Sequence, residues 1–392
     1  MIGFNKPYLT GNETLYIQQA VGLEKISGDG EFTRRCHRFF EEQYGFRKVL
    51  LTTSCTDALE MAALLTGIGP GDEIIMPSYT FVSTANAFVL RGARIVFADS
   101  GADNPNLDVA TLEPLITPRT RAIVPVHYAG VACDMDGIMA LARKYNLFVI
   151  EDAAQAIDSF YRGRPLGGIG HLAAFSFHET KNIMAGEGGM LVINDDRFVQ
   201  RAEIIREKGT NRSAFFRGEV DKYGWVDVGS SFLPSDIIAA FLYAQLENLT
   251  RIQDRRRQIW EWYRAGLAPL ADAGFLRLPP VPAFATNNAH MVYVVCRHAA
   301  EREGLINHLK DKGIQAVFHY LSLHASPYYR DKHDGRPLPR SDQYSDCLVR
   351  LPMYYELTQA QVETITAAVA GYCATLIPPP PAQSVRSGYE SL

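Results

Sequence analysis

The chain has 392 residues, of which 47% are hydrophobic and 21% charged, and its formal net charge is −4. This length and composition predict a globular protein with one large domain and a smaller one. The charge balance gives no sign of a nucleic-acid or membrane-surface partner, but it does not exclude a local basic pocket for a small anion.

Membrane insertion, secretion and structural cross-links are not expected. No apolar run reaches the roughly 18 residues of a membrane helix, and residues 1–7 lack the layout of a secretory signal peptide. The 6 cysteines are scattered and form no C-x-x-C pair. They therefore predict reduced thiols in the cytoplasm rather than a disulfide framework or a zinc site, and no metal site is expected.

Between about residues 48 and 194, short apolar runs alternate with segments of helical periodicity. The apolar runs are 48–51, 73–76, 94–98, 122–126, 147–150, 173–177 and 190–193. The helical segments between them include 56–65, 83–90 and 135–145. This alternation predicts an α/β fold, with a mostly parallel sheet between layers of helices.

The second half of the chain has a different pattern. Residues 235–268 are predicted to be helical, with a long helix that connects two domains and with 255–257 (Arg-Arg-Arg) on a solvated face. Apolar runs at 290–295 and 314–318 then alternate with helical segments at 301–312 and 358–372, which predicts a small α+β domain. We expect a large domain over 1–250, a small domain over 251–377, and a flexible, proline-rich tail over 378–392.

Four polar segments follow predicted strands, at the edge where open α/β sheets bind ligands. Residues 52–58 place small hydroxylated side chains at a helix start, which is typical of a phosphate site. Residues 77–81 supply an aromatic ring, 151–155 supply acids, and 176–182 contain Lys181 ahead of a glycine cluster. Each segment alone is also consistent with a bland role, such as a helix cap or a core aromatic.

The order of these four segments is more informative than any one of them. A lysine that can form an imine, and a carboxylate that can keep a pyridine nitrogen protonated, are what a pyridoxal-phosphate (PLP) site needs. A phosphate-binding turn and a stacking aromatic complete such a site. The sequence therefore predicts a PLP enzyme, and the lack of a G-x-G-x-x-G loop after the first strand disfavours a nicotinamide oxidoreductase.

The same segments resemble the DegT/DnrJ/EryC1/StrS family of sugar aminotransferases, which are fold-type I PLP enzymes. The resemblance extends from Gly28 to about Pro352. It is strongest in residues 53–59, 77–86, 124–130, 151–155, 176–182 and 186–189.

The resemblance implies roles for individual residues. Lys181 would be the Schiff-base lysine and would also move the proton, while Asp152 would pair with the pyridine nitrogen. The other implied cofactor contacts are Gln155 to the ring hydroxyl, Phe81 stacked on the ring, and Cys55, Thr56 and Ser176 to the phosphate. Contacts to the sugar nucleotide are expected from Arg212, Lys222, His319, Tyr320 and His324, since a diphosphate needs cationic or N–H donors.

The resemblance also implies the reaction and the assembly. A homodimer would transfer an amino group from L-glutamate, which leaves as 2-oxoglutarate, to a nucleotide-linked keto-deoxysugar. Residues 125–130 and 206–212 are most similar to members that aminate dTDP-4-keto-6-deoxyglucose to dTDP-4-amino-4,6-dideoxygalactose. Three alternatives stay open: a 3-aminotransferase of a related keto sugar, a PLP sugar dehydratase, and a non-catalytic PLP sensor. The dehydratases have histidine in place of the lysine, so Lys181 argues against that alternative.

Overall fold

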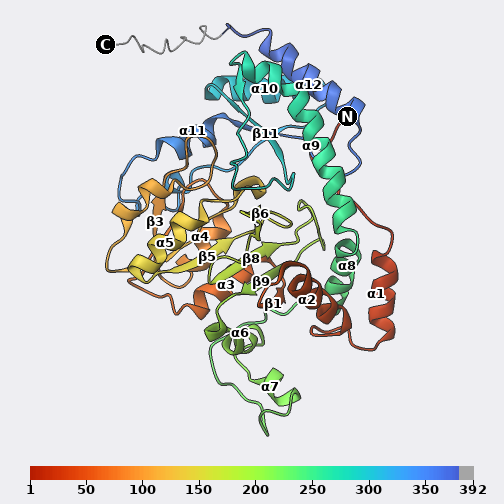
Figure 1. The fold of residues 1–392 in the computed structure, drawn as a ribbon, viewed down its shortest axis with the longest axis vertical. Coiled ribbons are helices and arrows are strands. Elements are labelled where there is room, and N and C mark those ends of the chain that lie inside the picture. Colours follow the sequence, from red (N-terminus) through yellow and green to blue (C-terminus); the bar gives the residue numbers. More distant parts are fainter. Residues whose placement is uncertain (379–392) are drawn as a thin grey trace, which may run out of the picture.

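The computed structural model describes residues 1–378 and contains a seven-stranded and a four-stranded sheet, with helices packed around both (Figure 1). The large sheet has the order β1 (Lys48–Thr52), β9 (Gly189–Ile193), β8 (Leu172–Ser176), β5 (Phe148–Asp152), β4 (Thr120–Ile123), β2 (Glu73–Pro77) and β3 (Arg94–Ala98). Strands β8, β5, β4, β2 and β3 are parallel, whereas β9 is antiparallel to both β1 and β8. The predicted, mostly parallel α/β sheet is confirmed.

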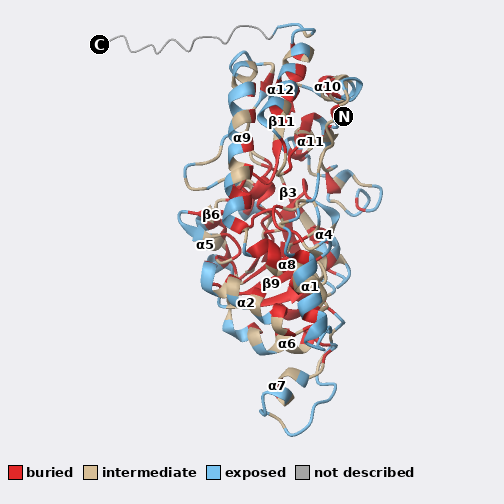
Figure 2. Cartoon of the chain, turned by 90° about the vertical axis from the view of Figure 1, so that its right-hand side faces the viewer, coloured by how far each residue is buried: buried red, intermediate tan, exposed pale blue. Residues whose placement is uncertain are grey.

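Helices cover both faces of the large sheet, which explains why its strands are almost wholly apolar. Successive residues of one strand enter opposite cores, as Ile74 and Ile75 of β2 do. One core is closed by α3 (Cys55–Leu65), α4 (Val82–Val89) and α6 (Val199–Arg206), and the other by α2 (Glu31–Tyr44), α5 (Met135–Tyr145) and α8 (Asp236–Leu246). Figure 2 shows the buried residues concentrated around the strands.

The predicted helical stretch 235–268 is two helices, α8 and α9 (Leu249–Asp272), separated at Glu247 and Asn248. The prediction that 255–257 lie on a solvated face is wrong for Arg256. This side chain is buried and donates hydrogen bonds to the carbonyl oxygens of Ala289 (3.1 Å) and His290 (2.8 Å). Because these two carbonyls have no strand partner there, the guanidinium satisfies them and remains hydrogen-bonded in the interior.

The small sheet has the order β10 (Leu276–Arg277), β11 (Val292–Cys296), β13 (Leu348–Leu351) and β12 (Val317–Phe318). One face, with Val292, Val294 and Val349, packs against α9, α10 (Ala299–Asp311) and α12 (Gln359–Cys373). The opposite face, with Val295 and Leu348, packs against tyrosines at the end of the large sheet. The space between the two sheets is therefore walled by aromatic rings.

The remaining elements are short or peripheral: α1 (Glu13–Gly22), β6 (Phe160–Tyr161), β7 (Arg164–Pro165), α7 (Arg212–Phe216) and α11 (Pro339–Cys347). Ile2 pairs with Ile314, so the N-terminal segment lies along the small sheet although the sequence places it with the large domain. The domain boundaries at 250 and 377 stay a prediction, and the predicted tail lies, beyond Pro378, outside the described residues. In residues 1–378, no helix combines the length and apolarity needed to cross a membrane.

Candidate active site at the carboxyl edge of the large sheet

The register of the large sheet brings the predicted site segments to one edge. Thr52, at the end of β1, and Ser176, at the end of β8, both lie opposite Gly189 of β9. Asp152, at the end of β5, lies opposite Ala174 on β8. The loops that follow β1, β5 and β8 therefore begin side by side.

The start of α3 packs directly on the backbone of β9. Ser54 caps the helix by accepting a hydrogen bond from the Asp57 backbone N–H. A Cβ atom at Gly189 would lie 2.2 Å from the carbonyl carbon of Ser54 and 2.4 Å from the nitrogen of Cys55, so only glycine fits. The first N–H groups of a helix attract anions, and Cys55 and Thr56 are the first two residues of this one. The Thr56 hydroxyl donates to Ser83 Oγ at 2.9 Å.

Asp152 is a buried carboxyl group with two donors. Thr84 Oγ1 donates to its Oδ2 at 2.7 Å, and the backbone N–H of Ala154 donates to its Oδ1 at 3.1 Å. Burial nevertheless raises the pKa of Asp152 above its ordinary value, although these donors and the charge of Lys181 act in the opposite direction. A cationic partner close to Asp152 would lower its pKa again and so favour the ionised carboxylate.

The amine of Lys181 makes no hydrogen bond or ion pair with any residue in the described part of the chain. Desolvation lowers its pKa, and the charges of Cys55 and Asp152 only partly compensate. The pKa of Cys55, in turn, is raised by desolvation and by Asp152. Because charges act on one another strongly only at short range, the Lys181 amine, the Cys55 thiol and the Asp152 carboxyl group lie close together. We call these three groups the Lys181 cluster.

The backbone beside Lys181 is held in place by its neighbour Asn182. The buried Asn182 amide donates to Gln253 Oε1 at 2.9 Å and to the Asn288 carbonyl at 2.8 Å, and its oxygen lies 2.8 Å from His290 Nδ1. The loop that carries the lysine is thus anchored to α9 and to the segment before β11.

Gln155 connects this cluster to the aromatic wall. Its Oε1 accepts from the Ala129 N–H at 2.6 Å, and its Nε2 donates to the Tyr320 hydroxyl at 3.0 Å. Tyr320 has a φ of 57°, a strained backbone conformation for a tyrosine. Its ring lies 6.0 Å from that of Phe81, which is 54% exposed at the start of α4. An exposed aromatic at this edge leaves a ring face open for stacking.

Adjacent acids at the end of β5 have different roles, because successive side chains of a strand point to opposite faces. Glu151 points to the face of the sheet opposite Asp152. Its Oε2 lies 2.9 Å from His127 Nε2, and both side chains are fully buried. Its carboxylate also accepts from the backbone N–H groups of Gly167, Ile169 and Gly170. Glu151 therefore stabilises the turn after β7, and Asp152 is left as the acid beside the lysine.

The structure places the predicted substrate residues in three different surroundings. His319 stacks on Tyr320 with ring centroids 3.6 Å apart, and its Nδ1 lies 2.7 Å from the Tyr128 hydroxyl, so it borders the cluster. His324 is occupied by other residues: its Nδ1 lies 2.8 Å from Ser78 Oγ, and its Nε2 lies 3.6 Å from Asp342.

Arg212 and Lys222 are exposed on residues 207–232, a loop that contains α7 and that we call the excursion. It projects from the body of the molecule (Figures 1 and 2). Within the single chain, the Arg212 guanidinium lies over the ring of Phe216, 5.1 Å from its centroid. Neither residue joins the Lys181 cluster of its own chain.

Sequence reasoning missed Thr84, the donor to Asp152, and Arg350, whose charge acts on Lys181. Thr84 is one of several small or polar residues in α4, whose sequence is VSTANAFV. Arg350 lies on β13, a strand too short to stand out in the sequence. The sequence around Thr84 and Arg350 does not indicate that they lie near Asp152 and Lys181.

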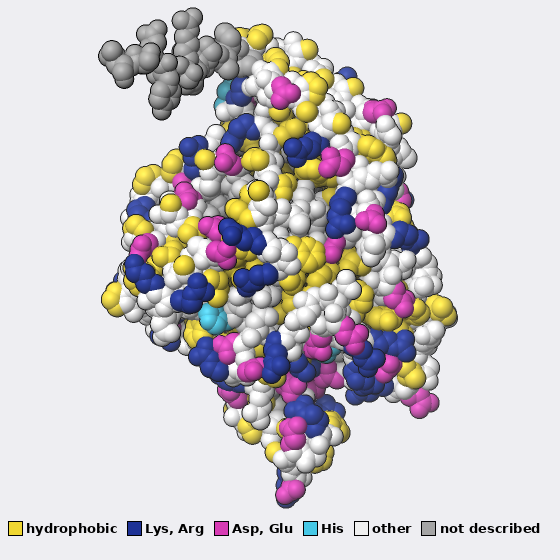
Figure 3. Space-filling view, viewed as in Figure 1, with side chains coloured by type: hydrophobic (Ala, Val, Ile, Leu, Met, Phe, Trp, Pro, Cys, Tyr) yellow, Lys and Arg dark blue, Asp and Glu magenta, His cyan; other side chains and the backbone are white. Residues whose placement is uncertain are grey.

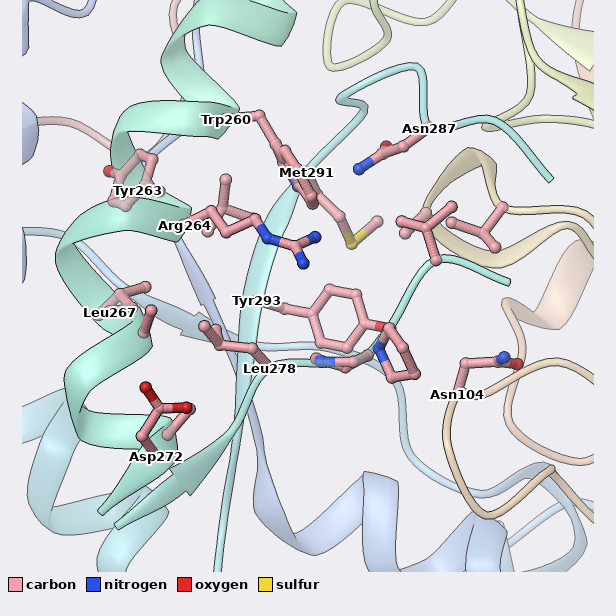
Figure 4. Close-up of a pocket in the computed structure, with 18 residues that line it drawn as sticks. Asn104, Trp260, Tyr263, Arg264, Leu267, Asp272, Leu278, Asn287, Met291 and Tyr293 are labelled. Atoms are coloured by element: carbon pink, nitrogen blue, oxygen red, sulfur yellow. The ribbon is translucent and has the colours of Figure 1, made fainter. Parts of the chain in front are cut away.

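A cavity of about 270 Å³ lies apart from Lys181, between α9 and β11 (Figure 4). Trp260, Arg264 and Tyr293 line it, and Tyr293 also contacts Tyr128 with ring centroids 5.5 Å apart. Lys181 itself borders a recess of only about 10 Å³. Size alone would favour the larger cavity as the active site. However, the partnerless amine of Lys181 lies with the buried carboxyl group of Asp152 and the N-terminal end of α3, and not at that cavity.

These groups fit PLP. The amine of Lys181 can bond to the carbonyl carbon of the cofactor, and the carboxyl group of Asp152 can pair with its pyridinium nitrogen. The N–H groups at the start of α3 can bind its phosphate. Residues 7–370 match the DegT/DnrJ/EryC1/StrS aminotransferase family. The chain belongs to this family.

Relatives cover almost the whole chain. A GDP-perosamine synthase from Caulobacter vibrioides is 34% identical over 370 residues, which are 93% of this chain and 96% of that protein. The solved structure of the aminotransferase TlmJ from Streptoalloteichus hindustanus has a TM-score of 0.88 and 30% identity, and it covers 95% of this chain and 99% of its own. That of DesV from S. venezuelae has a TM-score of 0.87 and 29% identity, and it covers 96% and 99%. The chain is thus a sugar aminotransferase whose cofactor is PLP, as predicted.

Proposed function

We propose that the enzyme transfers the amino group of L-glutamate to C4 of dTDP-4-keto-6-deoxyglucose, forming dTDP-4-amino-4,6-dideoxygalactose. The observation that carries the proposal is the partnerless Lys181 amine beside the buried carboxyl group of Asp152. Bound PLP supplies an electron sink for the carbon that loses a proton. The chain has to bind it, exclude water and move that proton.

Lys181 is proposed as the residue that holds PLP covalently and, once released, moves the proton. An ammonium group cannot accept a proton, so the lysine has to be neutral at that point. Burial, which lowers the pKa of Lys181, favours the neutral amine, and the charge of Arg350 acts in the same direction. Ping-pong kinetics are expected, because 2-oxoglutarate leaves the site before the keto sugar binds there.

Asp152 is proposed to hold a proton on the pyridine nitrogen. Thr84 and Ala154 donate to its two oxygens and so favour its ionised form. Gln155 would contact the ring hydroxyl and Phe81 would stack on the ring. Cys55, Thr56 and Ser176 are proposed to surround the phosphate, where the start of α3 supplies N–H donors.

Two resemblances bear on the identity of the nucleotide. Residues 125–130 and 206–212 favour a dTDP-linked sugar by their resemblance. A GDP-linked keto sugar is the second candidate, because the Caulobacter relative is named a GDP-perosamine synthase. The experiment is to treat the holoenzyme with L-glutamate, remove the free amino acid and add each keto sugar separately. Recovery of the original absorption by the dTDP sugar supports the proposal, whereas recovery by the GDP sugar alone would replace it.

A homodimer with shared active sites is proposed from the surface of the excursion. Three aromatic side chains of the excursion are exposed: Phe216 by 69%, Tyr223 by 53% and Trp225 by 85%. Several exposed aromatics on one projecting segment are typical of a protein contact surface. In such a dimer, Arg212 and Lys222 would reach the partner's site and bind its diphosphate. On the face shown in Figure 3, positive and negative side chains are intermixed.

The cytoplasm is the proposed location. All six cysteines are free and five of them are buried, which suits a reducing compartment. The amino sugar formed there would enter the synthesis of a cell-surface polysaccharide.

A further inference from the structure

The cavity between α9 and β11 lies where the two sheets meet (Figure 4). Trp260 and Arg264 of α9 and Tyr293 of β11 line it from the side of the small sheet. Asn104 and Ala129, which follow β3 and β4, line it from the side of the large sheet. Its volume of about 270 Å³ lies just below the roughly 300–1,000 Å³ of pockets for drug-sized ligands, so it suits a ligand smaller than a sugar nucleotide.

Arg264 brings a cation without a counter-ion into this cavity. Figure 4 shows its side chain extending from α9 toward Met291 and Tyr293. Within residues 1–378 it forms no ion pair and no hydrogen bond, and its guanidinium lies over the ring of Trp260, with Cζ 5.4 Å from the ring centroid. An aromatic face holds a guanidinium without using its N–H donors. Because Arg264 is exposed, a ligand can reach these donors from solvent.

Two other groups at the cavity can donate hydrogen bonds to a ligand. The side-chain oxygen of Asn287 accepts from the Ala289 backbone N–H at 2.8 Å, which identifies the other terminal atom as the amide nitrogen. Figure 4 shows this amide directed toward the middle of the cavity. In the described part of the chain, neither the Asn287 nitrogen nor the Tyr293 hydroxyl has a hydrogen-bond partner. Together with Arg264, these groups favour a ligand whose polar atoms accept hydrogen bonds.

The charges at the cavity favour a single negative charge on that ligand. Among the described residues that line it, Arg264 is the only cation and Asp272 the only carboxylate. Asp272 is about 12 Å from Arg264 along the axis of α9, and the two form no ion pair. In Figure 4 it lies beyond Leu267, so the Arg264 end of the cavity is the positive end. One guanidinium balances one carboxylate, whereas a phosphate monoester carries a charge of about −1.5 to −2.

The rest of the wall is apolar and partly aromatic. Leu267, Leu278 and Met291 lie around the ring of Tyr293, and the ring of Trp260 closes the opposite end (Figure 4). Aromatic side chains bind other rings by offset stacking or edge-to-face contact, with a gain beyond that of the buried area. The walls therefore favour a flat, apolar body next to the charged group.

We propose that this cavity binds a small organic acid with one carboxylate and an aromatic ring. The carboxylate pairs with the guanidinium of Arg264, which can hold it with two parallel hydrogen bonds. The ring packs between Trp260 and Tyr293. The site lies apart from Lys181, so its ligand is a different molecule from the substrates of the amino transfer.

The test measures binding of three indole probes to the PLP holoenzyme by calorimetry. Indole-3-acetate is an anion, indole-3-acetamide is neutral, and gramine is a tertiary ammonium ion that cannot form an imine with PLP. We expect the wild type to bind the acetate at least about tenfold more tightly than the amide, and gramine more weakly still. Arg264→Gln should weaken binding of the acetate by about tenfold or more and that of the amide by less than about threefold.

Arg251→Gln is the matched control. Arg251 is also an exposed arginine of α9 without an ion pair in the described residues, and its guanidinium also lies over an aromatic ring, that of Tyr8 at 5.8 Å. It does not line the cavity, so the affinity for indole-3-acetate should stay within about twofold of the wild-type value. Because both arginines are exposed, thermal unfolding of the two variants should match that of the wild type. Trp260→Leu should weaken binding of the acetate and of the amide by similar factors, since it removes only the ring contact.

Other outcomes would overturn the assignment. Equal affinities for the acetate, the amide and gramine, or equal losses in Arg264→Gln and Arg251→Gln, would show that Arg264 does not select an anion. Displacement of the acetate by 2-oxoglutarate would place the probe at Lys181 instead. Tighter, Arg264-dependent binding of thymidine 5′-monophosphate would replace the carboxylate by a phosphate. Unchanged binding in Trp260→Leu would refute the aromatic part of the proposal.

Discussion

Burial raises the pKa of Asp152, and the Thr84 hydroxyl, which donates to this carboxyl group at 2.7 Å, opposes that rise and favours the ionised form. Thr84→Val removes this donor at constant volume and should raise the pKa of Asp152 further. The ionised carboxylate is the active form, so activity is lost as pH falls through this pKa. The acid limb of the pH profile of the glutamate half-reaction should therefore move to higher pH, with about tenfold slower reaction at neutral pH.

Thr66→Val is the control for this prediction, since Thr66 is buried but bonds only to carbonyls of α3. It should cost about 1 kcal/mol of stability without moving the pH profile. A Thr84→Val enzyme whose profile is unchanged would show that Thr84 does not set the charge of Asp152.

Glu151 makes a pH-dependent contribution to stability. Burial by itself would raise its pKa, but His127 and backbone N–H donors lower the pKa below the ordinary value of 4.5. A carboxyl group with a lowered pKa stabilises the fold above its unfolded-state pKa, and this stabilisation is lost as pH falls below 4.5. Glu151→Gln should be about 3 kcal/mol less stable at neutral pH and should lose part of the acid dependence. Denaturant unfolding at several pH values measures both, and an unchanged midpoint would contradict the account.

The sequence predicted which residues gather at the site better than it predicted what they touch. Asp152 and Lys181 could be singled out because each follows a strand in the order that a PLP site needs. That Glu151 would be buried against His127 could not be inferred, because the partner lies in the segment that follows another strand, β4. The same applies to His324, whose partners Ser78 and Asp342 are distant in sequence.

At the level of elements, the contact between β9 and α3 shapes the phosphate end of the site. Gly189→Ala would press a methyl group into the backbone of Ser54 and Cys55 and push the helix start away from the strand. We expect about 1–3 kcal/mol of destabilisation and weaker PLP binding, measured by titrating the apoenzyme. In Gly188→Ala, the methyl group would have ordinary contacts, the nearest with Phe177 at 3.4 Å, and PLP affinity should be kept. Equal PLP affinity in both variants would contradict this role of Gly189.

Element types were predictable from local patterns, but their pairing was not. The seven apolar runs became strands, since each is β-branched or aliphatic and bounded by turns. That β9 runs antiparallel between β1 and β8 depends on contacts across the chain. The burial of Arg256 was missed because three consecutive arginines look solvated in sequence, whereas a helix turns each of them to a different side.

At the scale of the whole molecule, the excursion predicts complementation between subunits. Lys181→Ala and Arg212→Ala should each be nearly inactive alone. Mixed under conditions that exchange subunits, they should recover up to about a quarter of wild-type activity, because half of the dimers would be mixed and each would have one intact site. Phe216→Asp with Trp225→Ser should yield a monomer in sedimentation. If mixtures of the two variants stay inactive, or if the Phe216→Asp, Trp225→Ser monomer is active, the active sites are not shared between subunits.

The central claim is that Lys181 holds PLP and exchanges it with the amino donor. The most direct measurement is the absorption spectrum of the purified protein before and after adding L-glutamate, for the wild type and for Lys181→Ala. We expect a wild-type band near ~410–430 nm that converts to one near ~330 nm, and a variant that binds PLP but does not turn over. A wild-type cofactor band that ignores glutamate, or a Lys181→Ala enzyme that turns over normally, would contradict it.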